Sequence, residues 1–185
     1  MLNFIKLSPG EKKPDQKSLD DFYTDLSKLD NAAILLNKET VVVDFDEFPE
    51  IGRKILEKYP TMAFETKRGI HLYYKRPVQI NGHKILLKNW TKKLTVSGAL
   101  VDYKTGNKST ATIKQNGQLR KMHGTFEMFD DLPTLPLELL PVKVKNVLAG
   151  MKEGARNSSL YSHLMTVREM YELDYDTLMK IAEFI

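Results

Sequence analysis

Two aspartates separated by one residue offer the clearest candidate chemistry in this chain. They follow a run of β-branched residues, Thr40 to Val43, whose composition predicts a buried strand. In strand geometry Asp44 and Asp46 project from one face while Phe45 points to the other. Two such carboxylates repel unless a cation lies between them, and paired oxygens at an open edge suit Mg²⁺ or Mn²⁺. The same pattern also describes turn or helix-capping residues after a core strand, so its meaning depends on the rest of the chain.

A basic turn and a histidine follow the aspartate pair. Lys67, Arg68 and Gly69 predict a tight turn, and the strand after it places His71 and Tyr73 on one face. Phosphate oxygens would find a turn amide, two cations and an imidazole donor there. A single histidine on a strand is equally typical of a structural residue.

A third carboxylate, Asp102, lies in a predicted strand, where it shares a face with Leu100 and Lys104. If it lay beside Asp44 and Asp46, it would complete a site for two cations, and the surrounding basic residues would hold a triphosphate. The alternative is an ion pair with Lys104 that contributes little to stability.

The charge of the chain is unevenly distributed. The whole chain carries a net charge of +4, but residues 66–126 contain thirteen Lys or Arg and a single acid, Asp102. That stretch therefore carries +12 and the remainder −8, which favours a polyanionic partner whose binding weakens with salt. The alternative is a solvated basic face without a partner.

Composition excludes several protein classes. A chain of 185 residues, 42% of them hydrophobic, can bury one good core, and it contains no apolar run long enough to span a bilayer. The first residues lack the pattern of a secretory signal, and the absence of cysteine excludes disulfides and thiolate zinc sites. We therefore expect a cytoplasmic protein without a membrane partner.

Local patterns predict the secondary structure and the domain division. Helices are predicted at 18–29, 50–58, 143–151, 157–173 and 175–185. Strands are predicted at 32–36, from Thr40 to the aspartates, and at 62–66, 70–74, 85–88, 94–96, 99–103 and 110–113, the first two as an antiparallel hairpin. Prolines and acids after Gly124 suggest a boundary, so we expect a core over 1–124, a linker over 125–142 and a helical domain over 143–185.

The ordered set of motifs resembles the archaeo-eukaryotic primase superfamily, in the primase-polymerase branch of phages, plasmids and other mobile elements. Its first motif, acid, any residue, acid, is similar to Asp44-Phe45-Asp46. Its second, a small residue, any residue, then His, is similar to Gly69-Ile70-His71, and its third, an apolar residue then an acid, to Val101-Asp102. The stretch from Glu153 to Leu160 resembles the opening of the helical domain that often follows this module.

This resemblance implies a fold, an activity and a set of site residues. The fold is α/β (α+β), a mixed and mostly antiparallel sheet flanked by helices, with a small helical domain after it. The activity is DNA primase and polymerase, a nucleotidyl transfer from dNTPs or NTPs on a single-stranded template and primer. It implies that Asp44, Asp46 and Asp102 are the catalytic acids and hold two Mg²⁺ or Mn²⁺ ions.

The resemblance also implies what surrounds those acids. The nucleotide phosphates would be held by His71, Lys67, Arg68, Gly69 and Lys104. The candidates for template contact are Lys84, Lys88, Trp90, Lys92, Lys93, Arg156 and Asn157, because an indole could stack on a base while lysines follow the backbone. Trp90 is as readily a core residue. The last helical pattern runs to the final residue, so we expect a longer parent protein, in which the family implies a helicase domain. The resemblance also implies a bacterial or archaeal host cell.

Two other functions remain open on the sequence alone. The family often has Ser where this chain has Gly69, which leaves room for a degenerate replication-initiation or single-strand-binding module with a primase-like fold. Relatives with zinc elements use cysteines that this chain lacks, so no zinc is expected. A sugar-nucleotide transferase using the two aspartates would explain neither the basic stretch nor the C-terminal helices.

Overall fold

The computed structural model describes residues 2–15, 21–106, 108–143 and 156–185, apart from the side chain of Arg156. The described chain is a mixed α+β protein with mostly antiparallel sheets, as predicted. Its largest sheet has six strands in the order β12-β4-β5-β3-β9-β8. These strands span Met122–His123, Ala63–Glu65, Ile70–Lys75, Thr40–Phe45, Leu100–Thr105 and Trp90–Leu94.

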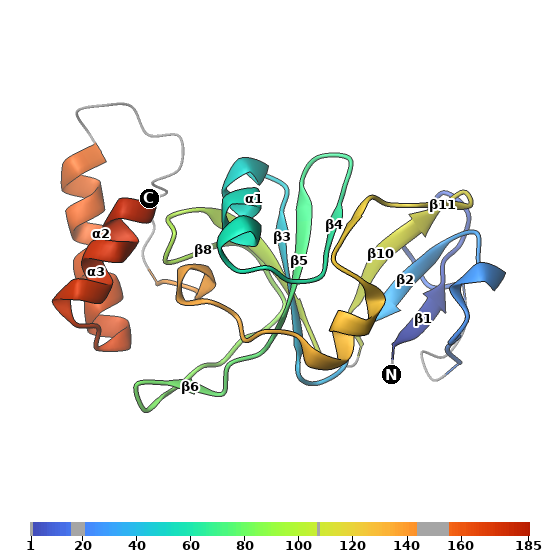
Figure 1. Ribbon diagram of the computed structural model, residues 1–185, viewed down its shortest axis with the longest axis horizontal. Coiled ribbons are helices and arrows are strands. Elements are labelled where there is room, and N and C mark those ends of the chain that lie inside the picture. Colours follow the sequence, from blue (N-terminus) through green and yellow to red (C-terminus); the bar gives the residue numbers. More distant parts are fainter. Residues whose placement is uncertain (1, 16–20, 107, 144–155) are drawn as a thin grey trace.

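A second sheet lies beside the first, and its buried side chains pack against one face of it (Figure 1). Its order is β1-β2-β10-β11, with strands at Asn3–Lys6, Ala32–Leu35, Thr110–Gln115 and Gln118–Leu119. A short ribbon, β6 (Gln79–Ile80) with β7 (His83–Lys84), extends from the body. The helices are α1 (Pro49–Lys58), α2 (Arg156–Tyr171) and α3 (Tyr175–Phe184), with 3-10 turns η1 (Leu26–Lys28), η2 (Phe126–Asp131) and η3 (Leu137–Leu139).

Strand β3 shows how the sheet separates a core from a site. All six of its residues are buried, and alternate side chains enter different clusters. Val41, Val43 and Phe45 pack with residues of α1, η3, α2 and α3, on what we call the core face. Val42 packs with residues of the second sheet and of η2, on what we call the acid face. Asp44 follows on the acid face, because side chains alternate along a strand.

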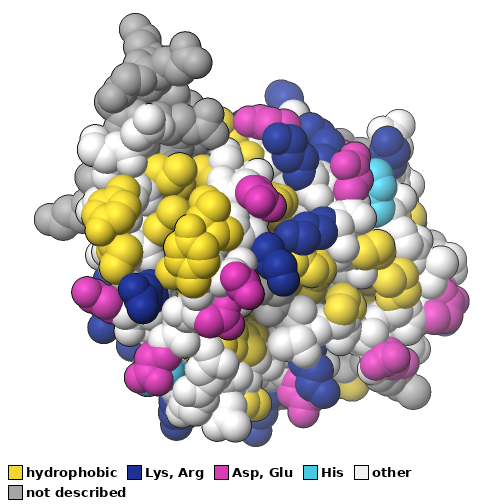
Figure 2. Space-filling view, turned by 60° about the vertical axis from the view of Figure 1, so that its left-hand side comes forward, with side chains coloured by type: hydrophobic (Ala, Val, Ile, Leu, Met, Phe, Trp, Pro, Cys, Tyr) yellow, Lys and Arg dark blue, Asp and Glu magenta, His cyan; other side chains and the backbone are white. Residues whose placement is uncertain are grey.

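The C-terminal helices share the core of the sheet. Val167 and Tyr171 of α2 and Ile181 of α3 are buried in the same cluster as β3. Exposed hydrophobic side chains remain on these helices, at Tyr161, Tyr175 and Met179. On this side of the molecule hydrophobic side chains gather beside charged ones (Figure 2). No described helix is long and apolar enough to cross a membrane.

The predicted linker is packed rather than extended. Phe129 and Leu132 are buried in the cluster of the acid face, and Leu135 and Leu139 in that of the core face. Its backbone also pairs with the sheet, through bridges between Lys75 and Thr134 and between Thr95 and Pro141. Prolines end regular structure, but they do not prevent a segment from covering apolar surface.

The first helix and the first hairpin are predicted wrongly, each because a long-range pairing prevails. Residues 21–25 of the helix predicted at 18–29 are not helical, because Phe4 and Tyr23 exchange backbone hydrogen bonds of 2.8 Å. Only the turn η1 follows, and residues 18–20 lie outside the described residues. The hairpin of 32–36 with the following strand is also absent. Instead β2 pairs with β1 and β10, while β3 pairs with β5 and β9.

The remaining local predictions fare better. Helices α1, α2 and α3 match the predicted ranges to within a few residues, as do β4, β5, β9 and β10. The prediction of a strand at 85–88 is wrong, because regular pairing is confined to the two-residue strands β6 and β7 just before it. The predicted helix at 143–151 lies outside the described residues except for Lys143.

Candidate active site

The register of three central strands places two acids and a histidine in one row. Asp44 on β3 is the Cα partner of His71 on β5 and of Asp102 on β9. Side chains directly opposite on neighbouring antiparallel strands have Cβ atoms roughly 4.5–5.5 Å apart and lie on the same face. Asp44 and Asp102 are therefore neighbours on the acid face, although they are far apart in the chain.

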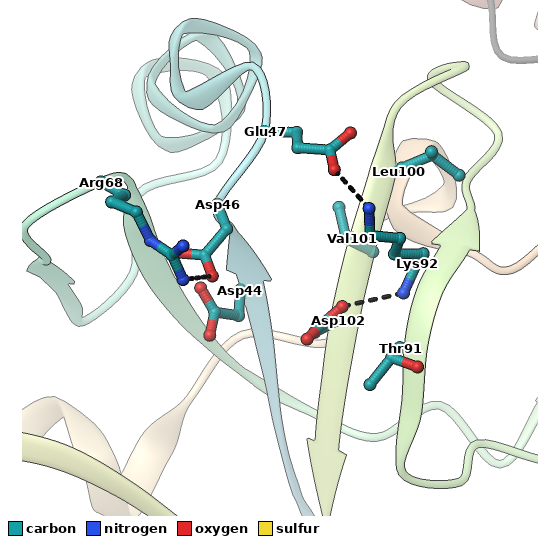
Figure 3. Close-up of a pocket in the computed structure, with 9 residues that line it drawn as sticks. All are labelled: Asp44, Asp46, Glu47, Arg68, Thr91, Lys92, Leu100, Val101 and Asp102. Atoms are coloured by element: carbon teal, nitrogen blue, oxygen red, sulfur yellow. Dashed lines mark hydrogen bonds and ion pairs between the residues drawn. The ribbon is translucent and has the colours of Figure 1, made fainter. Parts of the chain in front are cut away.

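Asp46 lies one residue beyond the end of β3 and faces the same space. A pocket of about 390 Å³ opens there, and Asp44, Asp46 and Asp102 all line it (Figure 3). Its other lining residues are Glu47, Arg68, Thr91, Lys92, Leu100 and Val101. We call this the acid pocket. The predicted convergence of the three aspartates on one cavity is therefore present in the structure.

Asp44 is the buried member of the three. Its Oδ2 accepts hydrogen bonds from Nε2 of His71 at 3.0 Å and from Nζ of Lys104 at 2.7 Å. Burial alone would raise the pKa of this carboxyl, but His71 and Lys104 together lower the pKa well below its ordinary value. Asp44 is therefore ionised at neutral pH, with Oδ1 buried and without a hydrogen-bond partner among the described residues.

His71 supports Asp44 and does not line the pocket. The side chain is only 6% exposed, and burial lowers the pKa of the imidazole although Asp44 acts in the opposite direction. A neutral ring that donates from Nε2 to the carboxylate has its acceptor at Nδ1, which is buried and unpartnered among the described residues. Nε2 of His71 thus makes a bond that orients Asp44, and its contact with a phosphate stays a prediction.

Asp102 is held by the edge strand of the sheet. Its Oδ1 accepts a hydrogen bond of 2.8 Å from the backbone amide of Lys92. The register of β8 shifts between Trp90 and Lys93, and Lys92 has a left-handed backbone with φ 48°. This bulge directs the Lys92 side chain to Glu47, at 3.0 Å. Lys92, predicted to contact template, therefore lies at the acid pocket.

The basic turn contributes one of its residues to the pocket. Arg68 donates to Oδ2 of Asp46 at 2.8 Å, whereas Lys67 is exposed on the turn and does not line the pocket. The amide of Gly69 donates to Oγ1 of Thr66 at 2.9 Å, so the turn itself already uses that donor. The amide predicted to contact a phosphate therefore donates to a side chain of the turn in this structure.

Gly69 departs from the family pattern for a reason of packing. A Cβ built on it would lie 1.6 Å from the carbonyl oxygen of Phe45, far inside van der Waals contact. Strand β5 and the end of β3 approach so closely here that serine or even alanine would force them apart. The glycine therefore reflects the backbone geometry of this chain and is no sign by itself of a degenerate site.

Two residues of the site were missed by sequence reasoning. Glu47 follows the aspartate pair directly, and its position could have suggested it. Arg120 is half-buried and donates to the carbonyl of Thr112 at 2.8 Å. Burial lowers the pKa of its guanidinium, against the attraction of Tyr73, Asp44 and Asp46. It comes from the loop after β11, and no local pattern marks it.

The arrangement concentrates polar groups that have no protein partner. Four buried side-chain atoms lack a hydrogen bond within the described ranges, and three of them belong to Asp44, His71 and Tyr73 on the acid face. Such atoms are rare in cores and gather where a ligand, ion or solvent binds. The oxygen donors suit Mg²⁺ or Mn²⁺, and so the residues fit the implied ions in kind.

The fit in geometry is not complete as the side chains stand. Within the described part of the chain, no group of three or more His, Asp or Glu is arranged to hold a metal ion. Lys104 and Arg68 instead supply the positive charge beside Asp44 and Asp46. A pair of divalent ions would require these cations to turn toward the phosphates they are expected to bind.

The remaining candidates for template contact lie elsewhere. Lys84, Lys88, Trp90 and Lys93 line a separate groove on the other side of β8. Asn157 is exposed in the first turn of α2, and Arg156 begins that helix with a side chain outside the description. The predicted set is therefore divided between the acid pocket, the groove and the helix.

Comparison with known proteins adds no relative. The chain matches no protein-family model, and a search of curated proteins gives no significant match. The resemblance to primases thus rests on the short motifs quoted above.

Proposed function

We propose that this chain is the catalytic part of a primase-polymerase of a mobile element, acting in the cytoplasm on a single-stranded DNA template. The observation that supports this most is the row of His71, Asp44 and Asp102 across three strands, with Asp46 in the same pocket. Two motifs from separate parts of the sequence line one cavity, and His71 of the remaining motif bonds to Asp44 beside it, which supports the family resemblance.

The proposed reaction is nucleotidyl transfer. The 3′ oxygen of a primer, or of a first nucleotide, forms a bond to the α-phosphorus of an incoming dNTP or NTP. The bond from that phosphorus to pyrophosphate breaks, and the hydroxyl proton passes to solvent water. Asp44, Asp46 and Asp102 would hold two Mg²⁺ or Mn²⁺ ions, which supply activation of the hydroxyl and neutralisation of the leaving pyrophosphate when bound.

The side chains around the acids provide position and charge. His71 orients Asp44 and, by donating to it, keeps its carboxylate in the ionised form. Arg68 and Lys104 stand beside the acids and would move to the triphosphate, where a cation offsets more charge. Lys92 fixes Asp102 through its backbone amide, which ties the edge strand to the site. Little covalent chemistry is asked of these groups.

A second candidate function has an observation in its favour. The cations of Lys104 and Arg68 already neutralise two of the acids, and the described residues include no ready metal group. A replication-initiation or single-strand-binding module that no longer synthesises DNA would be built in this way. The two functions differ in whether the acid pocket turns over nucleotides.

Primer extension with Asp102→Asn separates them. Asparagine can still accept the hydrogen bond from the Lys92 amide, so the pocket keeps its shape while one charge is lost. We expect extension with dNTPs and Mg²⁺ or Mn²⁺ to fall at least about a hundredfold. The matched control is Asp30→Asn, which changes an exposed acid outside the pocket and should extend as the wild type does. Oligonucleotide binding without extension in any metal would favour the module.

A further inference from the structure

A second cavity lies on the opposite side of the edge strand from the acid pocket. It has a volume of about 500 Å³ and is bounded by the ribbon β6–β7, by β8 and by the C-terminal end of α2. We call it the ribbon groove. Neither the acids nor the basic turn line it, so it is not part of the proposed catalytic site.

The ribbon groove is strongly basic. Lys84, Lys88, Lys93 and Lys143 line it, and no acid does. None of these four lysines forms an ion pair with a described residue; Lys93 instead lies with Nζ 5.6 Å from the centre of the Trp90 ring. The histidine that lines the groove, His83, is paired with Glu172 at 2.9 Å. Four uncompensated cations in one concave surface favour a polyanion.

The same groove exposes apolar surface among those cations. Leu86, which lines the groove, is 58% exposed. Trp90 is half-buried, packed edge-on against Tyr103 with ring centres 6.0 Å apart. An indole ring and an exposed leucine beside lysines suit unstacked bases and their phosphates, whereas a duplex hides its base faces. The combination favours a single strand over a duplex or a purely acidic peptide.

Strand β8 joins the ribbon groove to the acid pocket. It is the edge strand of the six-stranded sheet, and because of its bulge its side chains line two different cavities. Trp90 and Lys93 line the ribbon groove, while Thr91 and Lys92 line the acid pocket. A chain lying across this edge would therefore contact both cavities within a few nucleotides.

We propose that the ribbon groove binds single-stranded nucleic acid and that the bound strand passes over β8 to the acid pocket. Binding in the groove stands on the lysines, Leu86 and Trp90 alone. The passage of the bound strand to the acid pocket rests on the proposed function. The strand's phosphates lie against the four lysines, and its bases against Leu86 and Trp90.

Trp90 is the only tryptophan of the chain, so its fluorescence reports on the groove directly. Titration with an unlabelled dT12 oligonucleotide should quench this fluorescence, with the same midpoint as the anisotropy of a labelled dT12. Binding by anisotropy without any change in Trp90 emission would overturn the proposal. Parallel titrations with U12 and with a twelve-residue polyglutamate peptide identify the class of ligand, and equal binding of the peptide would also overturn it.

Substitution gives the second test. Lys84→Ala with Lys88→Ala should weaken dT12 binding about tenfold and make the slope of log K against log salt shallower by about 1.4, at about 0.7 per lost phosphate contact. The matched control is Lys12→Ala with Lys13→Ala, which removes the same charge from exposed residues outside the groove. Equal weakening by both double variants would show a general charge effect and contradict the groove.

Measuring binding and extension on the same proteins separates this proposal from the catalytic one. Asp30→Asn, which changes an exposed acid outside both cavities, should bind dT12 as the wild type does. If the lysine variants lose binding but no protein extends a primer, the groove stands and the polymerase fails. If the lysine variants bind normally, the groove fails, and the Asp102→Asn extension assay still decides the polymerase.

Discussion

The two faces of the six-stranded sheet are formed by the same strands but have different roles. On the core face Val41, Val43 and Phe45 are fully buried beneath helices. On the acid face only Val42 lies under the second sheet, and Asp44 follows beside His71 and Lys104. A single strand thus supplies stability to one face and a charged, incompletely satisfied cluster to the other.

This difference shows how a marginally stable domain can contain a site that lowers its stability. A buried carboxylate that lacks a partner for one oxygen costs stability, which apolar burial on the other face of the same strand offsets. The rigid register of β3 with β5 and β9 then fixes the acids more precisely than loops could. Changes on the two faces should therefore separate activity from stability.

The largest effect is expected from the acids themselves. Asp44→Asn and Asp102→Asn should each lower primer extension at least about a hundredfold, because each removes a charge from one shared ion site. The double variant should be no worse than either single one. Thermal melting of all three proteins checks that they are folded. Independent losses that multiply in the double variant would contradict a shared site.

Gly69→Ala is expected to act on stability instead. The new Cβ would collide with the Phe45 carbonyl, so we expect a loss of about 3 kcal/mol or failure to fold. Gly82→Ala is the matched control, because its φ is +80° but no atom lies within 4 Å of the added carbon. It should cost only about 1 kcal/mol in urea unfolding. A Gly69→Ala protein as stable as wild type would show that the strands approach less closely.

Acidification should weaken the core face through His163. This buried imidazole donates from Nε2 to the Val96 carbonyl at 2.8 Å, and burial lowers its pKa. A histidine whose pKa is lowered by folding binds protons better when unfolded, so stability is complete above the ordinary value of 6.5 and falls as the pH drops through it.

The variant that isolates this contribution is His163→Gln. Melting curves between pH 7.5 and 5 should show a smaller fall in Tm than for the wild type. Part of the fall should persist, because burial also lowers the pKa of His71. An unchanged pH profile would mean that His163 does not titrate on unfolding.

The smallest effect is expected at Lys92. Its side chain is 74% exposed and pairs only with Glu47, so Lys92→Ala should leave the melting temperature near that of the wild type. The backbone amide that holds Asp102 is retained by alanine. Extension should therefore fall by no more than about threefold. A large loss would assign the ammonium group itself to substrate binding.

Local patterns were sufficient for some elements and insufficient for others. The β-branched run before Asp44 and the apolar spacing of α2 gave elements that the structure confirms. The hairpin of β2 with β3 failed because both strands are apolar on both faces, so nothing in either sequence selects its partner. Long-range strand pairing determines the partner of each strand. The pairing of Phe4 with Tyr23 likewise takes the place of the predicted helix.

The site shows the same limit. Asp44, Asp46 and Asp102 could be grouped from motif order, and the structure brings them to one pocket. The role of His71 could not be predicted in detail, because burial and the bond to Asp44 depend on the register. Arg120 carries no signal in sequence, since it reaches the site only through the fold. The enzymatic function stays a prediction.

The central claim is that three acids from distant segments share one pair of divalent ions. A crystal grown with Mn²⁺ and a non-hydrolysable dNTP, measured at the manganese edge, tests it most directly. We predict anomalous peaks bounded by Asp44, Asp46 and Asp102, with Arg68 and Lys104 turned to the triphosphate. Manganese found elsewhere, with Lys104 still bonded to Asp44, would contradict the account.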